Sequence, residues 1–363
     1  MTAFSPHAPD RPPIGGPVLV IGCGLIGTSV GLALRAHDVD VALSDAQPGH
    51  VEAAVSRGAG RAFADDSEPF LVVVAVPPVA AAAVVADALK RWPTALVTDV
   101  TSVKSGLQRA VDQMPGAERF AGGHPMAGSE HSGPMAGSAQ LFEGRPWAVT
   151  PGSTTIPAAL DAVVDLALHV GAVPIIMDAT AHDRAVALVS HVPQVMSTLT
   201  AARLNDADGN YLALSGAGLR DTTRIAASDS ALWLDILGTN APDVRAVLEL
   251  VRDDLDRVIG ALGTDDTVLE DVLESGRRGA TLIPGKHGSV AASVDIVHVQ
   301  VADRPGELSR LMSDTGQSGV NIEDLRLEHD LGRQVGLAEI SVTVGVGNSL
   351  VEALTSRGWT AYR

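Results

Sequence analysis

The sequence predicts an α/β protein: a Rossmann-type doubly wound parallel sheet, then an all-helical dimerisation domain, then a small βαββαβ domain. Three observations support this. Hydrophobic residues make up 46% of the 363 residues and aromatic residues only 3%, which favours helices and parallel strands over an aromatic-rich sandwich. Short apolar runs alternate with helical stretches as far as about Met177, where helical periodicity takes over. A strand-rich segment begins at Val294.

Charge and cysteine content narrow the class of partner. The 26 basic and 43 acidic residues give a net charge of −17. This argues against nucleic acid or a membrane as partner, because both attract clustered Lys and Arg. The only cysteine, Cys23, forms no intrachain disulfide, and no signal peptide is recognised, so we expect a cytoplasmic protein. We expect no metal site.

Residues 1–16 are rich in proline and lack periodicity, which predicts a disordered leader. Residues 17–178 form the expected dinucleotide-binding domain. Within it, Leu71–Leu89 is nearly long enough to span a bilayer, but Pro77-Pro78 and Asp87 interrupt it, so we interpret it as a buried strand leading into a helix. The predicted strands are Val18–Gly22, Val39–Ser44, Leu71–Val76, Ala95–Asp99 and Trp147–Thr150.

Residues 179–288 form the predicted helical substrate and dimerisation domain. One apolar stripe in it keeps helical i, i+3/i+4 spacing, either as a core-facing stripe or as part of a subunit interface. The segment from Ser275 to Gly288 is rich in Gly and basic residues and indicates a linker or an ordered arm. The stripe consists of Val244, Val247, Leu248, Val251, Leu255, Val258, Ile259 and Leu262.

Residues 293–363 form a predicted third domain. Strands and helices alternate in it in the order βαββαβ, which is typical of a small split βαβ sandwich. The expected elements are a strand at Val294–Val301, a helix at Pro305–Asp314, strands at Val320–Leu327 and Val335–Val344, a helix at Ser349–Ser356 and a closing strand.

A glycine-rich turn after the first strand predicts a nucleotide site. It reads Gly22-Cys23-Gly24-Leu25-Ile26-Gly27, a pattern that lets backbone N–H groups approach a pyrophosphate at a helix N-terminus. Asp45, after the next strand, either holds the ribose 2′-hydroxyl, which favours NAD over NADP, or is a turn residue ahead of Gln47-Pro48-Gly49. Val76, Pro77 and Asp99, at the ends of two further strands, are the other expected cofactor contacts.

A single histidine suggests the chemistry. His124 lies in the stretch Gly122-Gly123-His124-Pro125-Met126-Ala127-Gly128-Ser129-Glu130, which we interpret as a loop. A histidine with a pKa near about 6.5 can accept a hydroxyl proton at neutral pH, as an alcohol oxidation requires. Ser102, after a buried strand, either caps a helix or places its hydroxyl beside the nicotinamide and His124. Lys104 is expected to be a solvated helix residue.

Two basic positions in the helical part are candidates for substrate binding. His191 is followed by Val192-Pro193, which indicates a helix end. Arg224 lies one helical turn after Arg220 and beside small and apolar residues, so we expect it to be buried toward a cleft. A buried arginine needs an anion, and a substrate carboxylate would supply one.

Five motifs in order carry a family resemblance. The motifs are the glycine-rich turn at residues 22–27, Thr98–Lys104, His124–Gly128, Ser190–Pro193 and Asp221–Ala226 with Trp233. Together they closely resemble the prephenate and arogenate dehydrogenases of tyrosine biosynthesis. The resemblance covers about residues 17–288. It implies that NAD oxidises the 4-hydroxyl position of a cyclohexadiene while a base takes the hydroxyl proton and the ring carboxylate leaves as CO₂.

The resemblance also implies roles for single residues. His124 would be the base, held by Ser102, and Arg224 would bind the ring carboxylate. His191 would contact the side chain of the substrate. The remaining substrate-binding positions are Ser129, Glu130, Asp221 and Trp233, with Glu130 and Asp221 forming an ionic gate near the pocket mouth.

Residues 294–363 resemble an ACT regulatory domain through Asp303-Arg304-Pro305-Gly306-Glu307-Leu308 and Gly319-Val320-Asn321-Ile322. The resemblance implies feedback regulation by tyrosine, with Asp303, Pro305, Gly306 and Asn321 as the regulatory residues. ACT domains usually pair side by side, which, with the helical stripe, argues for a homodimer.

Several alternatives stay open. Pro134 and Met135 lie in a loop that helps to separate prephenate from arogenate in relatives, but this position is not readable here, so arogenate is an alternative substrate. A β-hydroxyacid or 6-phosphogluconate-type dehydrogenase would use a lysine of the helical domain, and none lies between Lys104 and Lys286. A non-enzymatic regulator that senses NAD and an amino acid would not need both His124 and Arg224.

Overall fold

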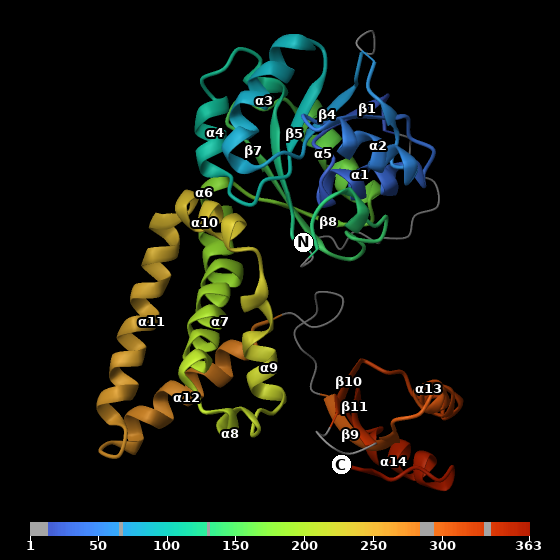
Figure 1. The fold of residues 1–363 in the computed structure, drawn as a ribbon, viewed down its shortest axis with the longest axis vertical. Coiled ribbons are helices and arrows are strands. Elements are labelled where there is room, and N and C mark those ends of the chain that lie inside the picture. Colours follow the sequence, from blue (N-terminus) through green and yellow to red (C-terminus); the bar gives the residue numbers. More distant parts are fainter. Residues whose placement is uncertain (1–13, 65–67, 129–130, 284–293, 330–334) are drawn as a thin grey trace. The chain divides into compact units, whose positions relative to one another are not determined.

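The computed structural model describes residues 14–64, 68–128, 131–283, 294–329 and 335–363, in two compact units, Met1–Val251 and Arg252–Arg363 (Figure 1). Most of the predicted leader lies outside the described residues. The end of the predicted leader, residues 14–16, is described, and Ile14 is buried in the core of the first unit. The globular part therefore begins before residue 17.

The first unit is built on a parallel sheet with strand order β3-β2-β1-β4-β5. This order reverses between β1 and β4, which opens a crevice for ligands at the carboxyl ends of those strands. Four of the predicted strands are found in this sheet, whereas the fifth, Trp147–Thr150, lies in a second sheet. β3 is a short edge strand that the sequence did not indicate. The strands are β1 (Val18–Ile21), β2 (Val41–Ser44), β3 (Arg61–Ala62), β4 (Leu71–Val74) and β5 (Leu96–Asp99).

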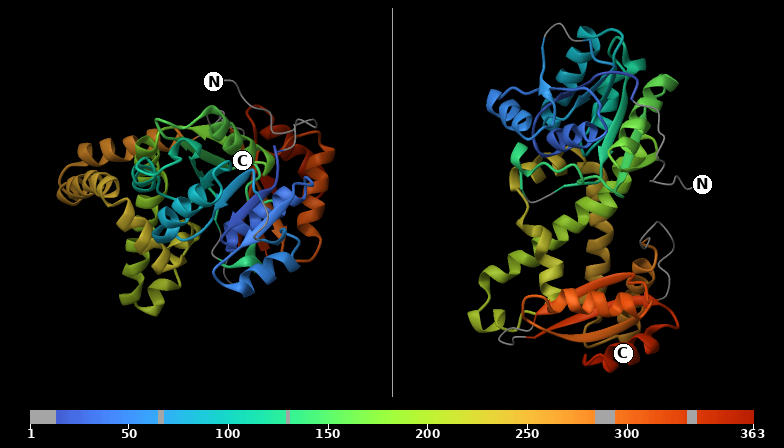
Figure 2. Two further views of the ribbon diagram at one scale, coloured as in Figure 1. Left: turned by 90° about the horizontal axis from the view of Figure 1, so that it is seen from above. Right: turned by 90° about the vertical axis from the view of Figure 1, so that its right-hand side faces the viewer.

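Helices cover both faces of this sheet (Figures 1 and 2). One face packs Val18, Val20 and Val73 against three helices, α1 (Leu25–Arg35), α2 (Pro48–Ser56) and α5 (Pro157–His169). The other face packs Leu19, Val72 and further strand residues against α3 (Pro78–Arg91) and α4 (Ser105–Val111). Strands buried on both faces need uninterrupted apolar runs, as the sequence has.

A second sheet, of order β6-β7-β8, contains β6 (Ala121–Pro125), β7 (Pro146–Pro151) and β8 (Val173–Ile176). The interpretation of His124 as a loop residue is therefore wrong, because it lies on β6, paired with Ala148 of β7. Glycine is required beside it, since a Cβ on Gly123 would lie 2.7 Å from the carbonyl oxygen of Asp99. Because the glycines of β6 have no side chains, the sequence shows no alternating strand pattern here. The same lack of side chains lets β6 approach β5.

The helical part begins with one continuous run, α6 (Ala179–Val186), the π-turn η3 (Ala187–His191) and α7 (Val192–Ala202). His191 therefore lies inside a helical run instead of ending one. Pro193 has no N–H for the helical ladder, which accounts for the wider turn before it. Further elements are η4 (Arg203–Asp206), α8 (Gly209–Leu212), α9 (Ala217–Thr223), η5 (Arg224–Ala227), α10 (Ser230–Thr239), α11 (Ala241–Ala261) and α12 (Asp266–Ala280), with 3₁₀ turns η1 (Ala117–Arg119) and η2 (Pro134–Ala136) in the first domain.

By length and composition alone, the run Ala179–Asp206 could cross a membrane. It carries the buried polar residues His182, Asp183 and His191, all hydrogen-bonded to other parts of the first unit. These contacts are those of a core helix in a globular domain. The segment Leu71–Leu89 is a buried strand and a helix, as predicted.

The apolar stripe on α11 divides into two halves. Val244, Val247 and Val251 pack against α7 and its neighbours, so this half is core. Leu255 and Ile259, further along, are 53% and 60% exposed. The segment from Ser275 to Gly288, expected to be a linker or an ordered arm, begins as a helix, because α12 continues to Ala280. Residues 284–288 of this segment lie outside the described residues.

The C-terminal domain has the predicted βαββαβ order. Its antiparallel sheet has the order β10-β11-β9-β12. Its core draws only on residues of this domain, with Val297, Ile340 and Leu354 at its centre. The elements are β9 (Val294–Ala302), α13 (Glu307–Gln317), β10 (Asp324–His329), β11 (Val335–Thr343), α14 (Gly347–Ser356) and β12 (Ala361–Tyr362).

Replacing Gly31 tests the contact between α1 and the segment that precedes β3. A Cβ on Gly31 would lie 2.4 Å from the carbonyl oxygen of Ala59, so Gly31→Ala should lower the free energy of unfolding by about 1–3 kcal/mol. The matched control is Gly276→Ala on α12, where a Cβ would have no described atom within 4 Å apart from adjacent residues and the helix's own backbone. Helix propensity should raise stability there by up to about 1 kcal/mol. Thermal unfolding compares the two. Equal stability of the variants would contradict the close contact.

Candidate active site

The glycine-rich turn forms a cradle between β1 and α1. Gly22 has φ +104°, and a Cβ there would lie 2.2 Å from the carbonyl oxygen of Ala75. A Cβ on Gly27 would lie 1.9 Å from the carbonyl oxygen of Gly22, so both positions require glycine. Gly24 differs, because a Cβ placed there would have no described atom within 4 Å apart from those of its adjacent residues and its own helix backbone. Gly24 therefore leaves open space in front of the α1 N-terminus, where Leu25 and Ile26 begin the helix.

Asp45 follows β2 beside this cradle. Its carboxylate accepts hydrogen bonds from the backbone N–H of Cys23 at 2.6 Å and of Gln47 at 2.8 Å. Asp45 therefore links the glycine-rich turn to the end of β2. Its hydrogen bond with Gln47 is the contact expected if Asp45 is a turn residue, which was the alternative interpretation. Val76 and Pro77 follow β4 at the same edge of the sheet.

Asp99 is the last residue of β5, at the carboxyl edge of the sheet. Its side chain is fully buried, and its carboxylate forms a close ion pair with the ammonium of Lys104. The backbone N–H of Thr101 donates to it at 2.8 Å. The prediction that Lys104 is solvated is wrong, because this side chain is 2% exposed and also donates to the carbonyl oxygen of Gly123 at 2.7 Å. Burial lowers the pKa of Lys104, while Asp99 and Asp183 oppose that shift.

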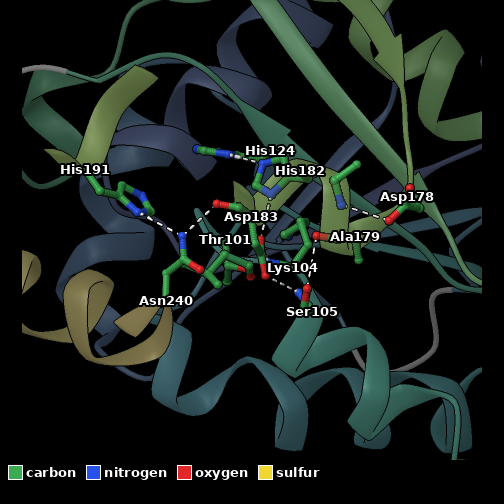
Figure 3. Close-up of polar contacts among 12 residues, drawn as sticks. Thr101, Lys104, Ser105, His124, Asp178, Ala179, His182, Asp183, His191 and Asn240 are labelled. Carbon is green, nitrogen blue, oxygen red and sulfur yellow. Dashed lines mark hydrogen bonds and ion pairs between the residues drawn. The ribbon is translucent and has the colours of Figure 1, made fainter. Parts of the chain in front are cut away.

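Asp183 of α6 is the centre of a second network (Figure 3). Its carboxylate accepts the backbone N–H groups of Lys104 and Ser105, each at 2.8 Å, and the ring Nδ1–H of His182 at 2.8 Å. Burial raises its pKa, but the hydrogen bonds from His182, Lys104 and Ser105 outweigh burial and lower the pKa to about 2. Asp183 is therefore a carboxylate at neutral pH.

His182 reaches from α6 to His124 on β6. Its Nε2 lies 2.9 Å from Nδ1 of His124, and the two rings meet edge to face. The expected contact with Ser102 is not found among the described hydrogen bonds of His124. Burial, then the neighbouring His182, Lys104 and His191, lower the pKa of His124 well below its usual value, while Asp183 opposes them. The ring is therefore neutral at pH 7.

His191 is tied to the same network through Asn240. The side-chain amide of Asn240 donates to the backbone carbonyl of Asp183 at 2.8 Å and lies 3.1 Å from Nδ1 of His191. Burial lowers the pKa of His191 to about 4, although Asp183 partly opposes this. Trp233 packs edge to face on His191, with ring centroids 6.0 Å apart. The structure thus brings two predicted substrate residues together.

Other predicted substrate residues lie at the surface. Arg224 and Asp221 are exposed, so the prediction that Arg224 is buried is wrong. Its turn, η5, is held to α7 by a hydrogen bond from Gln194 to the carbonyl oxygen of Ile225. Ser129 and Glu130 lie outside the described residues.

Sequence reasoning missed His182, Asp183 and Asn240. All three are buried, although polar side chains of these types are usually exposed. The adjacent pair His182-Asp183 within an apolar helical run was the one available signal.

Comparisons with known proteins identify the family. Residues 30–176 match the nucleotide-binding domain of prephenate dehydrogenase, and residues 178–273 match its dimerization domain. The chain belongs to the prephenate dehydrogenase family. It is an NAD-dependent oxidoreductase.

Individual relatives extend over most of the chain. A protein of Streptomyces niveus named a probable prephenate dehydrogenase is 37% identical over 357 residues, covering 94% of this chain and 98% of the relative. The structure of an Aquifex aeolicus prephenate dehydrogenase with hydroxyphenyl propionate and NAD⁺ matches with a TM-score of 0.66 and 27% identity, covering 73% of this chain and 97% of that one. A Synechocystis arogenate dehydrogenase matches with a TM-score of 0.61 and 26% identity, covering 73% and 98%.

The residues present fit NAD. The open space at Gly24 faces the N-terminus of α1, where backbone N–H groups favour a pyrophosphate. The Asp45 carboxylate, next to the cradle, suits a ribose hydroxyl and repels a 2′-phosphate.

Removing Lys104 tests the buried ion pair. Lys104→Met leaves the Asp99 carboxylate buried without its counter-charge and should lower the free energy of unfolding by about 3–5 kcal/mol. Arg61→Met, which breaks the surface pair with Asp40, is the control and should cost less than about 1 kcal/mol. Urea unfolding measures both. A Lys104→Met variant as stable as the control would show that the pair is not buried as described.

Proposed function

We propose that this protein converts prephenate to 4-hydroxyphenylpyruvate by NAD-dependent oxidative decarboxylation in tyrosine biosynthesis. The observation that carries the proposal is the placement of His124. Its Nδ1 is engaged by His182, and its Nε2 has no hydrogen-bond partner among the described residues. Its lowered pKa keeps it neutral, as a base for a hydroxyl proton must be. The names of the Streptomyces and Aquifex relatives support prephenate as substrate.

The proposed reaction begins at the ring hydroxyl of the substrate. His124 accepts the hydroxyl proton at Nε2 while the hydrogen on the same ring carbon leaves as hydride. Bound NAD⁺ supplies the hydride acceptor. The bond between the ring and its carboxylate then breaks and CO₂ leaves. The electrons of that bond pass through the ring to the new carbonyl oxygen, which takes back the proton as the ring becomes aromatic. The protein therefore needs to promote only the oxidation.

Further residues are assigned by position. Arg224 would bind the ring carboxylate through its guanidinium, which is exposed and has no ion pair among the described groups. His191, with Trp233 against its ring, would contact the substrate side chain. Ser102 would contact the substrate hydroxyl or the cofactor. Ser129, and Glu130 with Asp221 as a gate, complete the proposed set.

Arogenate is the second candidate substrate, because a matching structure is named an arogenate dehydrogenase. NADH formation at 340 nm, with prephenate and arogenate offered separately, decides between them. Turnover of prephenate supports the proposal. Turnover of arogenate alone would keep the chemistry and replace the substrate, and turnover of neither would refute it.

Two substitutions should separate catalysis from substrate binding. His124→Asn removes the base and should lower kcat by roughly 10²- to 10⁴-fold with little change in KM. Arg224→Ala should mainly raise KM, because a carboxylate contact is lost in both the ground and the transition state. Steady-state kinetics on the substrate that is turned over measure both. An unchanged kcat for the first variant, or an unchanged KM for the second, would remove that residue from the proposed site.

We further propose a homodimer formed through the helical domain and tyrosine binding by the C-terminal domain as an ACT domain. The half of the α11 stripe that contains Leu255 and Ile259 is exposed, and the matched domain is named for dimerization. The C-terminal domain has its own core. Asp303, Pro305, Gly306 and Asn321 are all exposed in it, at the start of α13 and before β10.

Deleting residues 290–363 tests both assignments. The shortened chain should keep its turnover and its dimeric state but lose inhibition by tyrosine, because the deleted domain does not contribute to the core of the first unit. Kinetics with added tyrosine and light scattering read out the two properties. Persistent inhibition would place the effector elsewhere, and a monomer would place the interface in the deleted domain.

A further inference from the structure

A chain of buried polar groups leads from the N-terminus of α4 to the ring of His124 (Figure 3). The Asp183 carboxylate lies 2.8 Å from Nδ1 of His182, and Nε2 of His182 lies 2.9 Å from Nδ1 of His124. The side chains of His182 and Asp183 are 1% and 3% exposed. At such depth each polar atom needs a partner of the right kind, so the direction of every hydrogen bond can be worked out.

The direction of these hydrogen bonds follows from the charge of the Asp183 carboxylate. An ionised carboxylate only accepts hydrogen bonds, so Nδ1 of His182 carries a proton. For His182 as the neutral imidazole, the proton on Nδ1 leaves the lone pair on Nε2. His182 then accepts from Nδ1–H of His124, and the lone pair of His124 is left on Nε2.

We propose that His182 and Asp183 are positioning residues that hold His124 as the Nδ1–H tautomer, with the Nε2 lone pair directed to the substrate hydroxyl. This inference rests on the proposed role of His124 as the base. Of the described side chains, His182 is the one that hydrogen-bonds to the His124 ring. Lys104 acts on the backbone instead, through the carbonyl oxygen of Gly123.

The other tautomer of His124 would not work. With a proton on Nε2, the ring would present a donor to the substrate hydroxyl and could not take its proton. The lone pair on Nδ1 would then face the lone pair of His182. The Asp183 carboxylate disfavours that arrangement, because it holds the proton of His182 on the far nitrogen.

Two substitutions of His182 test the proposal, because they differ in whether the new side chain can accept a hydrogen bond from His124. In His182→Gln the side-chain oxygen can still accept from Nδ1–H of His124, whereas in His182→Leu nothing can. We expect His182→Leu to lose roughly 10²-fold in kcat with KM within about 3-fold, as for the loss of an orienting partner. His182→Gln should recover kcat to within about 10-fold of the wild type. NAD binding by calorimetry is the control for folding, and His169→Leu, at a histidine outside the site, is the control for loss of a ring.

Two kinetic outcomes would overturn the proposal. One is an unchanged kcat for His182→Leu. The other is a folded His182→Gln that is no more active than His182→Leu, because an acceptor at this position would then be irrelevant.

A spectroscopic measurement needs neither substrate nor a folded variant of His182. In the wild type labelled with ¹⁵N-histidine, the ring of His124, assigned by its loss in His124→Asn, should show a protonated Nδ1 and an unprotonated Nε2. A protonated Nε2 would overturn the inference. If neither prephenate nor arogenate is turned over, the proposed function fails, yet the tautomer of His124 still decides this inference.

Discussion

The carboxylate of Asp183 is the interaction on which the site depends. It receives two backbone N–H groups from the start of α4 and one ring N–H from His182. A buried charge without such donors would be very unfavourable, so the position of α6 and that of the α4 N-terminus require each other. The ring of His182 is fixed as a result, and with it the ring of His124. One charged group of the helical domain thus sets the geometry of a residue on the nucleotide-binding domain.

Lys104 connects this carboxylate with a second one. Its backbone N–H donates to Asp183, while its ammonium pairs with Asp99 and holds the carbonyl oxygen next to His124. The resulting site has a buried cation close to a histidine. Burial and that cation together favour the neutral imidazole, which suits a base better than an imidazolium.

The parts of the fold that follow from local pattern could be predicted. An apolar run such as Leu71–Val74 predicts a buried strand in any parallel sheet with helices on both faces, and the glycine-rich turn predicts a nucleotide site in any such sheet. Strand β6 could not be predicted, because its glycines serve a close approach to β5 that only the folded chain reveals. The burial of Asp99 and Lys104 depends on how the chain folds back between the end of β5 and the start of α4, which brings the two side chains together. From the sequence, Asp99 was therefore interpreted as a cofactor contact and Lys104 as a solvated residue. The roles of His182 and Asp183 could not be predicted, because they depend on contacts with the N-terminus of α4 that no spacing in the sequence indicates.

The geometry of the site requires Asp183 to be an ionised, fully hydrogen-bonded carboxylate in the folded protein. The most direct test is the free energy of unfolding of the wild type and of Asp183→Asn as a function of pH. Because folding lowers this pKa from 3.8 to about 2, the stabilisation is complete well above pH 3.8 and is lost as the pH falls toward 2. We expect the difference in the free energy of unfolding between the two proteins to narrow by roughly 1 kcal/mol between pH 6 and pH 3. A difference that does not change with pH would contradict an ionised Asp183 carboxylate.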